Sequence, residues 1–427
     1  MRALPALLLT IAAAVGGPAT ADPSAATVEA ARHAIATRYV LPDTAAKLDA
    51  ALAAGLKAGH YRGLTGEPLA SRINADMAAV TPDKHLSIHH DPAMAKMLAN
   101  APLSDDADEA PPPAMARMMQ RMNGGVRAME VLPGNIRYLA YDGFAWGTPE
   151  AEAALRTGMA FLKGGDAYII DISRNGGGSP GAVAAMASYF VAEGTPLMRF
   201  EIRGKAGEET SAPRAPFSLA GKPLFVVTGT ASASAAEEFA THVKAYGFGT
   251  LVGETTAGAG FRNDMVPLPG GYVLSVSTGR AVSRKTGKDW ERVGVAPDVA
   301  TPFDSALPRA KAEAMAAVLA AAPADEKEQD GRLLGYYRAL ATPVALARPA
   351  AAYAGRYGER TVRVVDGGVT MQRDARPPLD LVPTGRDTFV ARQDPMAEVR
   401  FVAEGEQVTA LEVRQRDGSV SRAARAR

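Results

Sequence analysis

The stretch VVTGTASASAAEEFATH, residues Val226–His242, places two hydroxyl side chains where a helix is expected to begin. An apolar run ends at Gly229, a short turn follows, and an amphipathic pattern begins at Ser234. The N–H groups at a helix start can stabilise developing negative charge, so a serine there could be a nucleophile. Ser234 also opens a Ser-x-x-Glu capping box with Glu237, a pattern that many non-catalytic helices carry. The stretch alone leaves both interpretations open, and Ser232 lies inside the turn.

A second candidate is the glycine-rich turn DISRNGGGSPG, Asp171–Gly181, which joins a buried strand to a helix. Consecutive glycines can adopt positive φ and aim backbone N–H groups at an anion. The segment lacks the lysine and hydroxyl spacing of a phosphate-binding loop and the glycine spacing of a dinucleotide site. It is therefore either a tight strand–helix turn or a turn that binds an oxyanion.

Histidines gather in DKHLSIHHD, which contains His85, His89 and His90. A metal site would place His85 and His89 on one helix face together with a carboxylate. The Leu-Ser-Ile alternation predicts a strand instead, in which residues four apart lie about 13 Å from each other. We therefore expect no metal site, and each histidine taken alone is a structural one.

Two other side chains could assist a nucleophilic serine. Glu291 stands in DWERVGVAPDV and, taken alone, is a surface carboxylate beside a turn. His242 shares a helix face with Ser234 and is an alternative base. Two helical turns separate it from Ser234 by about 12 Å along the axis, which is beyond hydrogen-bond reach.

Composition excludes several classes of protein. The 427 residues are 47% hydrophobic and 22% charged, which predicts a globular protein of two or three domains. A net charge of +1 gives no support for nucleic acid as a partner. The absence of cysteine excludes disulfides, thiolate catalysis and cysteine-ligated metals.

The first 21 residues have the pattern of a cleaved secretory signal peptide. Arg2 supplies a positive start, Leu7–Val15 an apolar stretch, and Ala19–Ala21 a small-residue cleavage pattern. The apolar stretch is too short to cross a membrane, and no later run approaches 18 apolar residues. We expect a mature protein that begins near Asp22, is periplasmic or secreted, and does not insert into a membrane.

The remaining chain is typical of a multidomain α+β protein. The first part of the chain has the apolar spacing of helices. Alternating strands and helices follow, which predict βαβ units and a largely parallel sheet. The last part has short strands joined by Asp-Gly and Glu-Gly turns. The expected order is an N-terminal helical domain ending in a short strand (22–92), an acidic, Pro-rich and Met-rich linker (93–130), an α/β core (131–303), a helical connector (304–346) and a small antiparallel β domain (347–427).

The linker contains the methionine stripe MARMMQRM, residues 115–122. Methionine adapts to irregular apolar surfaces, so such a stripe could be a docking face. We favour a partly ordered helix that packs on the core.

Five segments occur in an order that resembles the tail-specific, or C-terminal-processing, serine peptidases, and most of all the branch of the tricorn core protease and the interphotoreceptor retinoid-binding protein. They cover about residues 81–302 without the linker and read DKHLSI, LPGNIRYLAYDGF, IIDISRNGGGSPGAV, TASASAAEEFATHVKAYGFGTLVGETTAGAG and DWERVGVAPDV. The resemblance implies a core of the ClpP/crotonase type. It also implies that the substrates are peptides or unfolded proteins and that no cofactor is needed. The resemblance does not predict an oligomeric state.

The resemblance separates the two serines. In the family, the nucleophile lies 19 residues before the glycine of a Gly-Glu-x-Thr segment, which is Gly253 here, so Ser234 is selected over Ser232. The processing branch carries a base lysine 25 residues after its serine. That position is Ala259 here, so a Ser/Lys dyad is absent.

The tricorn-like branch implies a Ser/His/Glu arrangement instead. His85 would be the general base for Ser234, and Glu291 the carboxylate that orients the imidazole. The backbone N–H groups of Gly177 and Ala235 are implied as the oxyanion hole. The resulting expectation is a secreted serine-type peptidase that forms an acyl-enzyme at Ser234.

Some features depart from this pattern. Lys84 stands where the tricorn-like site has a second serine, and only about 40 residues follow Asp91 before the first core strand, too few for the PDZ domain common in the family. The C-terminal domain resembles a lipocalin-like module of secreted relatives, and could instead attach the protein to a partner or envelope component. Because the retinoid-binding relatives are carriers, a catalytically silent carrier of an apolar ligand stays an alternative.

Overall fold

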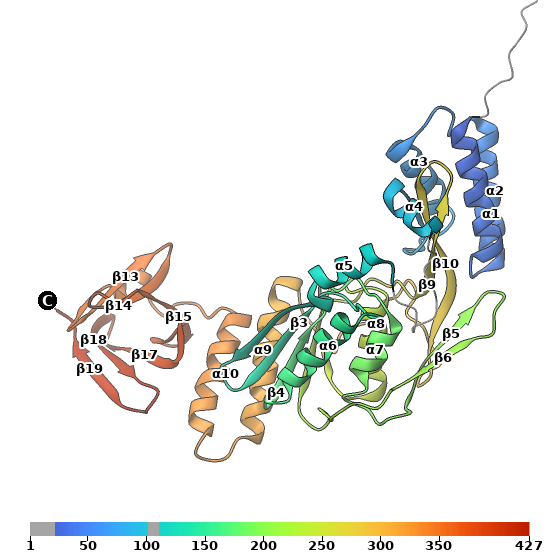
Figure 1. Ribbon diagram of the computed structural model, residues 1–427. Helices are drawn as coiled ribbons and strands as arrows, with labels where there is room; N and C mark the ends of the chain where they lie inside the picture. Colours follow the sequence, from blue (N-terminus) through green and yellow to red (C-terminus); the bar gives the residue numbers. More distant parts are fainter. Residues whose placement is uncertain (1–21, 101–110, 427) are drawn as a thin grey trace, which may run out of the picture. The chain divides into compact units, whose positions relative to one another are not determined.

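The computed structural model describes residues 22–100 and 111–426, so the predicted signal peptide and part of the acidic linker lie outside the described residues. The chain divides into two compact units (Figure 1). The first holds the described residues up to 82 together with 86–100 and 263–277. The second holds residues 83–85, 111–262 and 278–426.

The first unit is a helical bundle completed by a β-hairpin. Its elements are α1 (Pro23–Arg38), α2 (Pro42–Ala58), α3 (Gly66–Ala78), β1 (Ser87–His90), α4 (Pro92–Asn100), most of β9 (Phe261–Leu268) and the first half of β10 (Tyr272–Ser283). Val28, Leu48, Ile73 and Leu274 are fully buried in its core. The helices and the short strand agree with the sequence pattern. The return of the chain at 263–277 was not anticipated.

The second unit is built on a six-stranded sheet with the order β11-β8-β7-β4-β3-β2. Its strands are β2 (Val126–Leu132), β3 (Ile136–Tyr141), β4 (Ala167–Asp171), β7 (Leu224–Thr228), β8 (Thr250–Gly253) and β11 (Val299–Ala300). Neighbouring strands run parallel except β2 and β3. Because parallel strands end at one edge of a sheet, the turns after β4, β7 and β8 lie at a common edge, where ligands of open α/β sheets bind.

Helices cover both faces of this sheet (Figure 1). Ile170 and Val226 are buried with the helices of one face, and Ile169 and Val227 with those of the other. Consecutive side chains therefore enter two different cores, which explains why β4 and β7 read as continuous apolar runs. The first face carries α6 (Pro149–Leu162), α7 (Pro180–Ala187) and α8 (Ala235–Tyr246), and the second carries α9 (Phe303–Ala321) and α10 (Lys327–Ala341).

A smaller antiparallel group of strands belongs to the same unit. The second half of β10 pairs with β5 (Pro196–Ile202), and β5 pairs in turn with β6 (Glu208–Ser211). Ala281 of β10 lies opposite Phe200 of β5, and both are buried. The sequence pattern showed these strands only in part.

The methionine stripe forms α5 (Pro113–Arg121), followed by the 3-10 turn η1 (Asn123–Gly125). The predicted helix is present, but no residue of α5 is buried. Met118 and Met122 are 50% and 48% exposed. The helix contacts α6 and η1, but part of its apolar face stays exposed.

Residues 355–424 form an eight-stranded antiparallel sheet in which each strand pairs with the next. The strands are β12 (Gly355–Tyr357), β13 (Arg360–Val365), β14 (Gly368–Arg373), β15 (Leu379–Gly385), β16 (Thr388–Ala391), β17 (Asp394–Glu404), β18 (Gln407–Arg414) and β19 (Val420–Ala424), and the helix α11 (Ala350–Tyr353) precedes them. An antiparallel bridge between Tyr357 and Arg425 nearly closes the sheet into a barrel.

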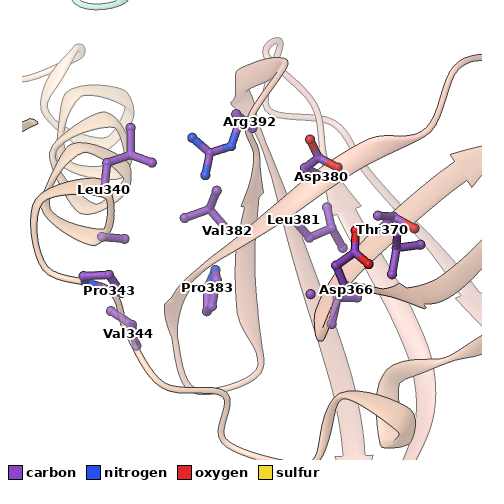
Figure 2. Close-up of a pocket in the computed structure, with 14 residues that line it drawn as sticks. Leu340, Pro343, Val344, Asp366, Thr370, Asp380, Leu381, Val382, Pro383 and Arg392 are labelled. Carbon is purple, nitrogen blue, oxygen red and sulfur yellow. The ribbon is translucent and has the colours of Figure 1, made fainter. Parts of the chain in front are cut away.

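The interior of this near-barrel is filled by side chains. Tyr353, Phe389 and Phe401 pack with ring centroids 4.9–5.4 Å apart, and all three are buried. The resemblance to a lipocalin-like module does not extend to an open ligand cavity inside these strands. A cavity of about 490 Å³ lies outside them instead, with Leu340 and Pro343 on one side and Asp366 and Asp380 on the other (Figure 2).

The architecture confirms the expected fold class, a multidomain α+β protein with a helical N-terminal region, an α/β core and an antiparallel β domain. Within the described parts of the chain, no helix is long and apolar enough to cross a membrane.

Candidate active site

Ser234 stands at the junction of β7 and α8, where the strand–turn–helix pattern places it. β7 ends at Thr228 and α8 begins at Ala235, so Ser234 is the N-cap of the helix. Its backbone has φ 55° and ψ −119°, which glycine adopts freely but which costs an L-residue about 1–3 kcal/mol. A strained turn between strand and helix is the geometry that presents a nucleophilic serine at the edge of an α/β sheet.

The glycine-rich turn after β4 lies directly against Ser234. A Cβ added at Gly177 would lie 2.8 Å from the Ser234 Cβ and 3.1 Å from the backbone nitrogen of Ala235. No side chain fits there, and the φ of 108° at Gly177 also favours glycine. The structure therefore makes neighbours of Gly177, Ser234 and Ala235, three of the five residues predicted for the site.

Asn175 fixes the shape of this turn and was missed by the sequence analysis. Its Oδ1 accepts the N–H of Gly177 at 2.8 Å, and its Nδ2 donates to the carbonyl of Tyr141 at 2.8 Å. Its own carbonyl accepts the N–H of Ala233 at 3.0 Å, which ties the turn to the serine loop. Of the two backbone N–H groups implied as the oxyanion hole, that of Gly177 thus already donates a hydrogen bond to Asn175. An asparagine two residues before a glycine was the available signal.

Glu237 holds the nucleophile loop to a second loop, residues 255–260. Its carboxylate is fully buried and accepts four hydrogen bonds. Oε2 accepts the N–H groups of Ser234 at 2.9 Å and Ala259 at 2.8 Å. Oε1 accepts the hydroxyl of Thr256 and the N–H of Gly258, both at 2.6 Å. The predicted capping box is present, but the carboxylate does much more than cap the helix.

The 255–260 loop positions Glu291 in turn. The carbonyl of Gly258 accepts the N–H of Arg292 at 2.9 Å, and the indole N–H of Trp290 donates to the carbonyl of Ala259 at 3.1 Å. The N–H of Gly260 donates to Oε2 of Glu291 at 2.7 Å. A Cβ added at Gly260 would lie 2.7 Å from the backbone nitrogen of Glu291, so glycine is needed for this approach.

The Glu291 side chain is largely buried, at 8% exposure. Its Oε1 is buried without a hydrogen bond, and the guanidinium of Arg292 lies 3.9 Å away. Burial, with the charge of Asp83 as a further cause, raises the pKa of Glu291 to about 7, against the lowering effect of the Gly260 N–H. A carboxylate with one oxygen held and the other open can accept one more donor, such as an imidazole N–H.

His85 reaches the second unit on the tripeptide Asp83–His85, whose flanking residues belong to the first unit. The buried Oδ1 of Asp83 accepts the N–H of His85 at 2.8 Å, and Lys84 donates to the carbonyl of Ala257. Burial lowers the pKa of His85, and the charge of Asp83 opposes that shift. Asp83 thus acts electrostatically on both His85 and Glu291, and the 255–260 loop binds both of their segments.

The two alternatives weighed from the sequence have structural roles. Ser232 is fully buried and donates its hydroxyl to the carbonyl of Ile172 at 2.7 Å. His242 is fully buried in the core, with its Nε2 3.5 Å from the carboxylate of Glu238. Neither side chain is open to a substrate.

The remaining histidines of the DKHLSIHHD stretch lie in the first unit. His89 and His90 are exposed ends of β1, and the ring of His90 packs beside Tyr272 with centroids 4.8 Å apart. The predicted strand is present. Across residues 22–100 and 111–426, no cluster of three or more acidic, histidine or cysteine side chains could hold a metal ion.

A serine on a strained strand-to-helix turn, beside a glycine turn and a helix start, is typical of a serine hydrolase. Comparison with known families identifies which one. Residues 135–301 match peptidase family S41, and residues 19–127 match the N-terminal domain of Peptidase_S41 in eukaryotic IRBP. Because the two matches together span more than half of the chain, the protein belongs to the S41 serine peptidases. The family predicted from the sequence motifs is confirmed.

Several solved structures resemble this chain. The photosystem II D1 C-terminal processing protease is 17% identical over 66% of this chain and 94% of that chain, with a TM-score of 0.43. A lipoprotein from Streptococcus agalactiae is 15% identical over 74% of this chain and 100% of that chain, with a TM-score of 0.49. The tricorn protease is 13% identical over 73% of this chain and 36% of that chain, with a TM-score of 0.42.

The Glu237 carboxylate can be tested by a substitution that keeps its shape. Glu237→Gln places an NH₂ group among donors, so at least one buried N–H loses its acceptor. We expect a loss of about 1–3 kcal/mol in the free energy of unfolding, and about 100-fold slower peptide hydrolysis because both loops shift. Urea unfolding and hydrolysis of a quenched-fluorescence peptide measure the two effects. The exposed Glu150→Gln is the control, and wild-type behaviour of Glu237→Gln would contradict the role.

The backbone strain at Ser234 predicts an unusual order of stability. Ser234→Ala keeps a Cβ in the strained conformation, whereas Ser234→Gly removes it. We expect Ser234→Gly to be more stable than Ser234→Ala by about 1 kcal/mol or more, although glycine is normally the more destabilising residue. Thermal unfolding of the two variants side by side provides the measurement. Equal stability, or a more stable alanine variant, would show that the turn is unstrained.

Proposed function

We propose that the protein is a secreted serine-type peptidase that hydrolyses peptide bonds through an acyl-enzyme at Ser234. His85 acts as the general base and Glu291 as the carboxylate that orients its imidazole. The observation that carries the proposal is the buried Glu237 carboxylate. It connects the N–H of Ser234 to the loop whose Ala257 and Gly260 bind the segments of His85 and Glu291.

In the proposed reaction the imidazole of His85 takes the proton of the Ser234 hydroxyl as Oγ attacks the substrate carbonyl. The resulting imidazolium is stabilised by Glu291. The oxyanion develops beside the first turn of α8, where the N–H of Ala235 can donate to it. The N–H of Gly177 becomes a second donor when it exchanges Asn175 Oδ1 for the substrate oxygen. His85 then returns the proton to the leaving amine, and water releases the acyl group.

The proposed location is the periplasm or the extracellular medium. The support comes from the sequence alone, from the charged, apolar and small-residue pattern of residues 1–21. Peptides or unfolded proteins are the proposed substrates, as the S41 family implies.

The nucleophile can be identified with a fluorophosphonate probe, which labels an activated serine. We expect the wild type to be labelled and Ser234→Ala to be unlabelled, while Ser211→Ala, an exposed control on β6, is labelled normally. His85→Ala should slow labelling and peptide hydrolysis by about 100-fold or more, because the base is lost. Labelling of Ser234→Ala would show that another residue is the nucleophile. A wild type that neither reacts nor hydrolyses peptides would favour the apolar-ligand carrier.

The pH dependence separates the roles of Glu291 and His85. The pKa of Glu291 is raised to about 7, so its negative charge is lost as the pH falls through about 7. The lowered pKa of His85 keeps its imidazole neutral, and able to accept a proton, below the ordinary value of 6.5. We expect kcat/KM to rise with pH around a midpoint near 7. Glu291→Gln should be slower, with its midpoint moved below 6.5. An unchanged midpoint in Glu291→Gln would refute the role of Glu291.

A further inference from the structure

Helix α5 presents an apolar face that the described residues cover only in part. Met115, Met118, Met119 and Met122 are spaced as one continuous stripe of a helix, and together they are called the methionine face here. None of the four is buried, and Met118 and Met122 are about half exposed. An isolated exposed methionine needs no explanation, but a full stripe indicates an interaction surface.

The methionine face ends beside the proposed oxyanion turn. A Cβ added at Gly143 would lie 3.7 Å from the Cε of Met122 and 4.0 Å from the carbonyl oxygen of Gly177. That carbonyl accepts the N–H of Phe144 at 2.9 Å, which fixes residues 143–144 against the turn. Since Gly177 in turn lies against Ser234, Gly143 and the Gly177 turn together separate the methyl end of Met122 from Ser234.

We propose that the methionine face is a docking surface for apolar side chains of the peptide substrate, next to the bond that is cleaved. The proposal rests on the proposed peptidase function and adds a substrate preference to it. The contacts run from Ser234 through Gly177 and Gly143 to Met122, so side chains a few positions from the cleaved bond of an extended peptide can reach this surface. Methionine is flexible and polarizable, so the face suits apolar residues of different shapes.

The positive charge of α5 also limits which peptide sequences suit the methionine face. The segment Pro113–Arg121 carries Arg117 and Arg121 and no acidic residue. Both arginines are exposed. A peptide segment that combines apolar residues with neutral or acidic ones fits this helix, whereas a lysine- or arginine-rich segment is repelled.

The chain offers a matched control for this surface. Met129 on β2 is 42% exposed, close to the exposure of Met122. It lies three residues along β2 from Val126, which pairs with Tyr141 at the site edge of the sheet. That distance is about 10 Å along the strand, so Met129 is not part of the methionine face.

The experiment measures binding without turnover, in the full-length chain carrying Ser234→Ala. Two fluorescein-labelled decapeptides of equal net charge are compared by fluorescence anisotropy, one rich in Leu, Val and Ala and the other in Ser, Gly and Asn. We expect Met122→Glu and Met118→Glu each to weaken binding of the apolar peptide by about tenfold, the equivalent of one lost side-chain contact. Met122→Leu should restore it, and Met129→Glu should match the unsubstituted background.

The outcomes distinguish this inference from the peptidase function. If the apolar peptide binds equally well to all variants, the methionine face is not the docking surface, even in an active peptidase. If Met129→Glu weakens binding as much as Met122→Glu, the effect is general and the inference fails. If Met118→Glu and Met122→Glu selectively weaken binding of the apolar peptide, the docking surface is supported. If the wild type at the same time fails to hydrolyse peptides, only the proposed peptidase function is overturned.

Discussion

The candidate site depends on one buried charge, the carboxylate of Glu237. A carboxylate with no water around it is stable only when its oxygens are fully hydrogen-bonded, and here four donors from two loops provide those bonds. Because the donors come from Ser234 and from the 255–260 loop, satisfying the charge also sets the distance between the nucleophile and the loop. Glu291 and the segment of His85 bind that same loop, so their positions follow from a requirement that is electrostatic rather than catalytic.

Much of this arrangement could be predicted from the sequence, for identifiable reasons. The apolar runs of β4 and β7 and the glycine turns after them are local signals, and they located Ser234 and Gly177 correctly on strand–helix turns. The role of Glu237 was only half visible. Its capping position is local, whereas its bonds to Gly258 and Ala259 join residues 21 and 22 positions away that no periodicity connects.

Other features escaped prediction because they depend on partners distant in sequence. The hairpin at 263–277 completes the N-terminal bundle, yet its alternation resembles that of any other strand pair. The methionine stripe was expected to pack on the core because its apolar spacing predicts an amphipathic helix. Such spacing does not say how much of the apolar face is covered. Among the described residues the cover of α5 is only partial, and Met118 and Met122 stay about half exposed.

If His85 is the base, as proposed, catalysis depends on more than the unit that carries Ser234. Only three residues, Asp83–His85, belong to the second unit, and the chain on both sides of them belongs to the first. Local unfolding of the helical unit would then displace this proposed base while leaving Ser234, Glu237 and Glu291 folded. Such a chain would be inert without being denatured. On the proposed mechanism, partial unfolding would therefore end peptide cleavage before the α/β core loses its structure.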